Sequence, residues 1–327
     1  MEGKPAPARP LTPAAHPFSA PAGGFVTLDG EPFYRIAAYD SLEPFLMTLA
    51  NDADLWLFIS SHGGLTAGRI DPDGALFPYV TVDELHDAHH HTGPRTLVRL
   101  ASADGATTLW EPFADRAGEA QVERNLYKST AGTRLVFEEI DHALGLAFRH
   151  EWAGCDEFGW VRTATLENRT GATRRLDLLD GLLNVLPHGA PLGLYQQTPN
   201  LVDAYKKSEI DPATGLGVFS LTAGITDRAE ALESLKANVV WCCGLAGSRR
   251  HLSRRSLDDF RRGRAAAADA TLNGVRGNYL VGASLKLGPG ATVRWRLVCD
   301  TGRDHVGVSA LRRLLREEPD LDARVAA

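Results

Sequence analysis

The residues with the most evident capacity for chemistry are four histidines, His86, His89, His90 and His91. Neutral imidazoles are common zinc ligands, so this segment could hold a metal. Adjacent histidines, however, rarely point into one coordination sphere, and neither a cysteine nor a second cluster accompanies them at a ligand spacing. The sequence therefore favours a polar loop, and we expect no metal and no other cofactor.

The segment from Trp56 to Tyr79 joins an apolar strand to a polar, glycine-rich loop. Glycines let backbone amides approach a ligand, but the loop lacks the ending of a P-loop and the spacing of a dinucleotide fingerprint. A structural loop that needs positive φ is favoured. The alternative is a loop that contacts substrate or another domain. Its contact residues would be Ser61, His62, Gly63, Gly64, Arg69 and Tyr79.

A second candidate contact region contains Asp203, Tyr205 and Lys206. An aromatic face can stack on a pyranose ring while charged groups hydrogen-bond to the hydroxyls around it. The same side chains are typical of domain interfaces. Substrate binding and domain contact both remain open for these residues.

No residue stands out as catalytic. Glycoside hydrolysis needs two carboxyl groups on either side of one bond, and spacing along strands does not show which carboxyls converge. A Ser-His-Asp hydrolase is unsupported because no GxSxG motif is present. For acid–base chemistry on a sugar, the pairs to test are His150 with Glu151 and His188 with Glu167.

Composition and charge exclude some partners. The chain has 327 residues, of which 44% are hydrophobic and 23% charged, with a formal net charge of −6. Arginines gather only between Arg249 and Arg264, where Leu252, Leu257 and Phe260 predict the apolar stripe of an exposed helix. Nucleic acid is therefore not an expected partner.

The four cysteines form no CxxC pair and are expected to be reduced core residues. The proline-rich N-terminus, residues 1–22, has no continuous apolar region and is interpreted as a disordered leader. No stretch approaches the roughly 20 apolar residues of a membrane span. We expect a cytoplasmic protein with no membrane partner.

Short apolar runs separated by turn residues favour an all-β sandwich over residues 23–302. We predict a hairpin over residues 134–152, two strands joined by a turn at residues 168–171, and another hairpin around Gly288. Helical spacing of Val308, Leu311, Leu314 and Leu315 predicts a closing helix in residues 303–327, ended by Pro319.

The segment ATLENRTGATRRLDLLDGL resembles paired strands in the N-terminal super-sandwich of glycoside hydrolase family 94, the cellobiose phosphorylase type formerly called glycosyltransferase family 36. Further segments resemble an uncharacterised branch near that family. They are the segment from Trp56 to Tyr79, WEPF at Trp110, NLYKS at Asn125 and FRRG at Phe260.

This resemblance implies a large antiparallel β-sandwich of the galactose mutarotase-like class. It also implies a linker helix toward an (α/α)6 barrel that carries the catalytic residues, so no catalytic residue carries over to this chain. The chain would be the N-terminal domain of a phosphorylase or hydrolase of β-glucosides, supporting the barrel, aiding homodimer formation and contacting an oligosaccharide or sugar phosphate. The alternatives are a stand-alone sugar mutarotase or epimerase, and a non-catalytic carbohydrate-binding module.

Overall fold

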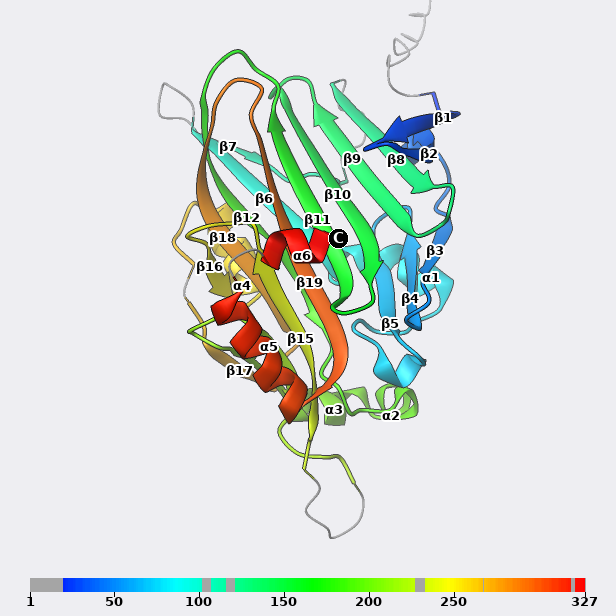
Figure 1. The fold of residues 1–327 in the computed structure, drawn as a ribbon, viewed down its shortest axis with the longest axis vertical. Coiled ribbons are helices and arrows are strands. Elements are labelled where there is room, and N and C mark those ends of the chain that lie inside the picture. Colours follow the sequence, from blue (N-terminus) through cyan, green and yellow to red (C-terminus); the bar gives the residue numbers. More distant parts are fainter. Residues whose placement is uncertain are drawn as a thin grey trace, which may run out of the picture.

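The computed structural model describes residues 20–101, 107–115, 121–226, 233–266, 268–318 and 321–326. Most of the expected leader lies outside these ranges. Nineteen strands form three antiparallel sheets within them (Figure 1). The prediction of a large antiparallel β-sandwich is therefore confirmed.

The largest sheet has eleven strands and forms one side of the molecule. In spatial order they are β1 (Ala22–Leu28), β2 (Glu31–Ala37), β8 (Val122–Ser129), β9 (Arg134–Asp141), β10 (Leu146–Cys155), β11 (Gly159–Asn168), β19 (Thr292–Asp304), β15 (Lys236–Cys243), β14 (Gly217–Leu221), β13 (Lys206–Ile210) and β17 (Thr271–Asn273).

Two smaller sheets contribute to the core against the inner face of the large one. The five-stranded sheet runs β16 (Arg249–His251), β18 (Gly277–Leu287), β12 (Arg174–Val185), β6 (Gly93–Ala101) and β7 (Thr107–Trp110). The three-stranded sheet comprises β3 (Leu46–Ala50), β4 (Leu55–Ser60) and β5 (Leu65–Arg69).

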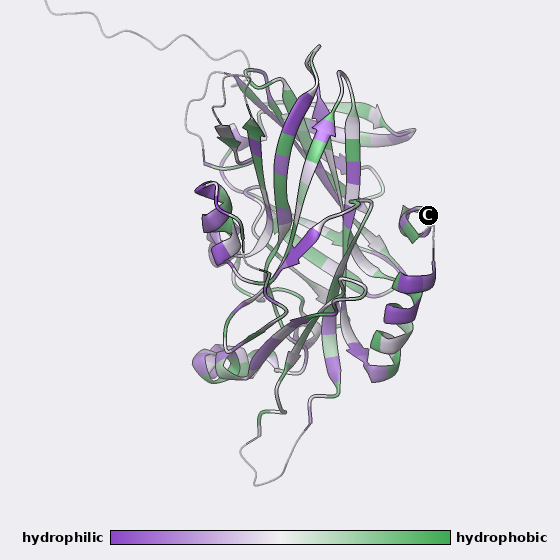
Figure 2. Ribbon diagram, turned by 90° about the vertical axis from the view of Figure 1, so that its left-hand side faces the viewer, coloured by the Kyte–Doolittle hydropathy of each residue, from purple (hydrophilic) through white to green (hydrophobic). Residues whose placement is uncertain are grey.

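The core follows from strict alternation along the strands, because successive side chains point to opposite faces. On β10, Phe148 and Trp152 are fully buried, whereas Arg149 between them faces outward and is exposed. Side chains of all three sheets join one hydrophobic cluster, including Trp295 of β19 and Leu178 of β12. Figure 2 shows the resulting mixture of hydrophobic and hydrophilic residues along single strands.

The predicted hairpin over residues 134–152 is confirmed by the pairing of β9 with β10. The predicted turn at residues 168–171 is confirmed, because it joins β11 to β12, although these strands belong to different sheets. The predicted hairpin around Gly288 is wrong, because that turn joins β18 to β19 and they too belong to different sheets. The Asn168 side chain is buried and donates to the carbonyl oxygens of Leu287 and Gly288. These hydrogen bonds connect the turn after β11 to the turn after β18.

Short helices cover the edges and outer faces. They are α1 (Val82–Asp87), α2 (Leu192–Gln197), α3 (Pro199–Tyr205), α4 (Arg255–Arg261), α5 (His305–Glu317) and α6 (Leu321–Ala326), with single 3₁₀ turns at Tyr39–Ser41, Pro72–Gly74 and Ala88–His90.

The arginine-rich helix is α4, which packs Leu257 and Phe260 on the outer face of the five-stranded sheet. Leu252 precedes this helix and lies in the main core, so the predicted three-residue stripe is only partly correct.

The closing helix α5 covers the outer face of the large sheet together with α6 (Figure 1). Leu311 of α5 packs in one cluster with Trp241 and Val298 of the sheet. The apolar stripe is therefore covered within this chain and does not by itself call for a partner domain. The helix ends at Glu317, and Pro319 lies outside the described residues.

All four cysteines are free thiols, as predicted. Burial raises the pKa of Cys242 to about 12, which keeps this thiol protonated and unreactive at neutral pH. Among the described helices, none combines the length and the hydropathy that crossing a membrane requires.

Candidate functional site

The candidate site is a pocket over the inner face of the large sheet, beside the start of β6 and the loop after β4. We call it the histidine pocket. Its cavity volume is about 40 Å³, and an ordered water needs roughly 10–15 Å³ on this measure. Its lining residues are Tyr39, His62, Gly63, His89, Pro94, Arg95, Thr96, Pro112, Phe113, Phe137, His150 and Arg162.

His150 of β10 lies against the aromatic wall of the pocket. Its ring stacks on Phe137 at 5.0 Å and meets Phe113 edge-on at 5.3 Å. The Nδ1 atom is buried and has no hydrogen-bond partner among the described residues. Burial, together with the nearby Arg162 cation, holds the pKa of His150 well below its usual range. The pocket is therefore lined by a neutral imidazole whose buried Nδ1 has no partner among the described residues.

An ion pair behind His150 joins the two main sheets. Arg162 of β11 and Asp180 of β12 are both fully buried, and Arg162 Nη1 lies 2.8 Å from Asp180 Oδ2. The same carboxylate accepts hydrogen bonds of 2.6 Å from Thr96 Oγ1 and from Trp295 Nε1. These contacts fix the arginine in place, so it can supply positive potential but no mobile proton.

The buried carboxylate of Glu139, on the strand beside β10, is also fully engaged. Oε1 accepts from Trp110 Nε1, and Oε2 accepts from the Phe113 amide and from Arg124 Nε. Asp180 and Glu139 are therefore both held by hydrogen bonds within the fold, and their contacts indicate structural roles.

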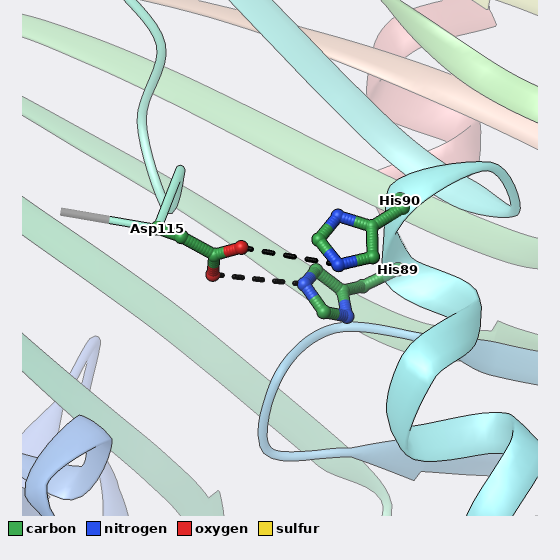
Figure 3. Close-up of side chains that lie close together, drawn as sticks. All are labelled: His89, His90 and Asp115. Atoms are coloured by element: carbon green, nitrogen blue, oxygen red, sulfur yellow. Dashed lines mark ion pairs between the residues drawn. The ribbon is translucent and has the colours of Figure 1, made fainter. Parts of the chain in front are cut away.

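The mouth of the pocket gathers histidines from two segments. His62 lies 5.4 Å from His89, ring centre to ring centre. His89 Nε2 and His90 Nε2 lie 3.7 Å and 3.9 Å from the two carboxylate oxygens of Asp115, as Figure 3 shows. Adjacent histidines rarely point into one coordination sphere, but the 3₁₀ turn Ala88–His90 places both of these rings beside one carboxylate.

His89 is oriented by the backbone. Its Nδ1 lies 2.9 Å from the carbonyl oxygen of His86, which can only accept, so Nδ1 carries the proton. Burial is the largest influence on the pKa of His89 and lowers it. The neutral ring then presents its Nε2 lone pair toward Asp115.

The glycine-rich loop contributes His62 and Gly63 to the pocket. Ser61 instead bonds to the backbone of Phe45, its Oγ accepting from the Phe45 amide. Gly63 has a φ of 93°, and a Cβ on Gly64 would lie 2.1 Å from the Leu85 carbonyl oxygen. Both glycines are thus required by the backbone and by packing on α1.

Arg69 and Tyr79, also predicted as contact residues, do not appear among the described residues that line the pocket. Arg69 Nε lies 3.3 Å from Asp300 Oδ1 at the end of β19. Tyr79 packs edge-on against Trp56 at 5.6 Å. Both residues have clear structural contacts.

Asp203, Tyr205 and Lys206 form a separate cluster at α3 and the start of β13. Lys206 Nζ lies 2.7 Å from Asp203 Oδ1 and 5.4 Å from the centre of the Tyr195 ring. Tyr205 packs in the small hydrophobic cluster of this region. None of the three lines the histidine pocket as described.

The two acid–base pairs expected from sequence do not form. His150 faces inward on β10, whereas Glu151 faces outward and accepts from Arg134 Nε at 2.8 Å. Glu167 is opposite Thr292 at one end of β19. His188 lies beside Gly302, ten residues further along that strand and so roughly 30 Å away.

Sequence reasoning missed Arg162, Asp180 and Phe113 as parts of this region. One signal was available for Arg162, because it occupies an inward position in the alternating strand β11, between the buried Trp160 and Ala164. A charge at such a position requires a buried partner.

A more open hollow lies on the outer face of the large sheet, between the β1–β2 turn and α6. Four of its five arginines pair with carboxylates within the chain. Arg149 Nε lies 2.5 Å from Glu138 Oε1, and Arg296 pairs with Asp322. Compensated charges make this hollow a weaker candidate than the histidine pocket.

No family model matches the chain, and no curated protein matches it. Among solved structures, it is similar to a putative aldose 1-epimerase from Klebsiella pneumoniae, with a TM-score of 0.41, 10% identity and coverage of 93% of this chain and 92% of that one. A putative aldose 1-epimerase from Escherichia coli K12 has a TM-score of 0.41 and 10% sequence identity, and the match covers 79% of this chain and 99% of that one. A polysaccharide lyase has a TM-score of 0.41 and 11% sequence identity, and the match covers 80% of this chain and 33% of that one. Similarity this distant does not extend to activity, so function is inferred from the residues of the pocket.

Proposed function

We propose that this chain binds a carbohydrate at the histidine pocket and serves a carbohydrate-active enzyme. The observation that carries the proposal is His150, a buried neutral imidazole with an unpartnered Nδ1, held between Phe113 and Phe137. Aromatic faces suit the apolar side of a sugar, and a fixed imidazole suits a hydroxyl group.

The size of the pocket limits how a sugar would bind. A cavity volume of about 40 Å³ accommodates a hydroxymethyl group but not a whole pyranose ring. We propose that one exocyclic hydroxyl reaches His150 while the ring rests at the mouth, near His62 and His89.

The finer assignment is that the chain is the N-terminal sandwich of an enzyme similar to glycoside hydrolase family 94, in the cytoplasm and able to form homodimers. Its support is the resemblance of the sequence motifs. Several of their residues hold the fold together: Glu111 of the WEPF motif accepts from Arg261 of FRRG at 2.6 Å. Asn125 and Tyr127 of NLYKS both donate to Glu138.

A stand-alone mutarotase receives less support than binding. It would need a free carboxylate beside the histidine. The nearby carboxylates of Asp180 and Glu139 are engaged by three donor residues each.

Calorimetric titration with glucose, cellobiose and glucose 1-phosphate tests the proposal. We expect one of these sugars to bind, and His150→Phe to abolish the binding while preserving the aromatic packing. Binding that His150→Phe leaves unchanged, or no binding of any of the three, would contradict it. Polarimetry of freshly dissolved glucose separates the alternatives, since mutarotation faster than in buffer would favour the epimerase.

A further inference from the structure

We propose that His89, His90 and Asp115 form a zinc site at the mouth of the histidine pocket. The proposal does not depend on carbohydrate binding, because it is argued from the positions and contacts of these three side chains. One ligand atom from each residue lies within 4.8 Å of the others.

The distances are close to those of a coordinated ion. With zinc bonds of about 2.0–2.1 Å at tetrahedral angles, neighbouring ligand atoms lie about 3.4 Å apart. The Nε2 atoms of His89 and His90 lie 3.7 Å and 3.9 Å from oxygens of Asp115. A contraction of a few tenths of an ångström, through rotation of the exposed Asp115 side chain, would bring both carboxylate–imidazole distances to this value. The three side chains are drawn in Figure 3.

The orientation of His89 supplies an independent argument. Its Nδ1 proton is donated to the His86 carbonyl oxygen, the arrangement by which metal-binding histidines are usually fixed. Its Nε2 is buried and has no hydrogen-bond partner among the described residues. A lone pair and a carboxylate that face each other repel, and a cation between them would stabilise the arrangement. A second imidazole at the same point favours a metal ion over a proton.

The ligand set favours zinc. Two imidazoles and one carboxylate suit zinc and are poor ligands for magnesium or calcium, which prefer oxygen. Three protein ligands leave a fourth position for water or a hydroxyl group, as in catalytic rather than structural zinc sites.

Calorimetry with zinc chloride on the full chain, made without a polyhistidine tag and stripped of metal, tests the proposal. We expect one zinc ion per chain, with a dissociation constant of about 1 µM or tighter. His90→Ala and Asp115→Asn should each weaken binding at least about tenfold, and magnesium chloride should give no heat of binding.

The matched control is His91→Ala, which removes a histidine of the same segment that is not part of the cluster. It should leave zinc affinity within about twofold of the unaltered chain. Asp115 is 75% exposed, so Asp115→Asn should fold normally, which circular dichroism checks. Cobalt substitution adds a visible absorption band that depends on the ligands. Absence of zinc binding, or equal loss in His91→Ala and Asp115→Asn, would overturn the proposal.

Discussion

Removing the carboxylate of Asp180 should destabilise the protein strongly. This residue joins the two main sheets by pairing with Arg162, and neither side chain is exposed to solvent. In Asp180→Ala, the guanidinium of Arg162 stays in the core. Among the described residues, its one remaining hydrogen-bond partner is Thr96 Oγ1. The substitution also deprives the Trp295 indole N–H of its acceptor.

The magnitude follows from these two losses. Leaving one partner of a buried ion pair uncompensated costs about 3–5 kcal/mol. An unsatisfied indole N–H adds about 1 kcal/mol. We therefore expect Asp180→Ala to lower the free energy of unfolding by about 4–6 kcal/mol, a large share of the 5–15 kcal/mol typical of a folded domain.

Urea unfolding followed by tryptophan fluorescence measures this loss. Asp177→Ala is the matched control, because Asp177 lies on the same strand but is 44% exposed and pairs with Arg99 at the surface. It should cost less than about 1 kcal/mol. The double variant Arg162→Met with Asp180→Leu should be more stable than Asp180→Ala, since no charge is left buried. A loss below about 2 kcal/mol for Asp180→Ala, or a less stable double variant, would refute the reasoning.

Three further predictions concern other parts of the fold. The pKa of His150 is depressed in the folded state, so below about pH 6.5 the unfolded chain binds a proton at this residue that the folded chain does not. The free energy of unfolding therefore decreases as the pH falls below this value, by up to about 1.4 kcal/mol per pH unit. His150→Phe should remove this part of the acid sensitivity in urea melts at pH 5 to 7, whereas the exposed His305→Gln should not. Gly64→Ala should lower the free energy of unfolding by about 1–3 kcal/mol, because the added Cβ would meet a backbone carbonyl oxygen. The control Gly193→Ala lies at an exposed position and should be tolerated. Equal melting temperatures for the two variants would contradict this expectation. Leu311→Ala should cost about 2–4 kcal/mol if α5 is an integral part of the fold, and unchanged thermal unfolding would show that it is not.

The strands were predictable because their signal is local. Local patterns between residues 134 and 168 identify β9, β10 and β11. The turn at Gly288 was also predictable. The partner of each strand was not, since a turn signal says that the chain reverses and not whether the next strand joins the same sheet. β12 and β19 therefore pair differently from the prediction.

The site was less predictable than the fold. His62 was identified from the sequence, but its neighbour His89 was assigned to a polar loop. Local geometry alone disfavours a shared coordination sphere for adjacent histidines. The ligand atoms lie together because a 3₁₀ turn orients His89 and His90 and because the fold places Asp115, from a distant segment, beside them.

By itself, the sequence determined the all-β class, several strands and turns between residues 134 and 302, the amphipathic closing helix and the free thiols, because each depends on neighbouring residues or on composition. Only the tertiary structure decided that α5 packs on its own sheet, that Arg162 meets Asp180 across the sandwich and that His89 and His90 converge on Asp115. Those contacts join residues far apart in the chain. They arise from how the sheets stack, which local periodicity does not encode.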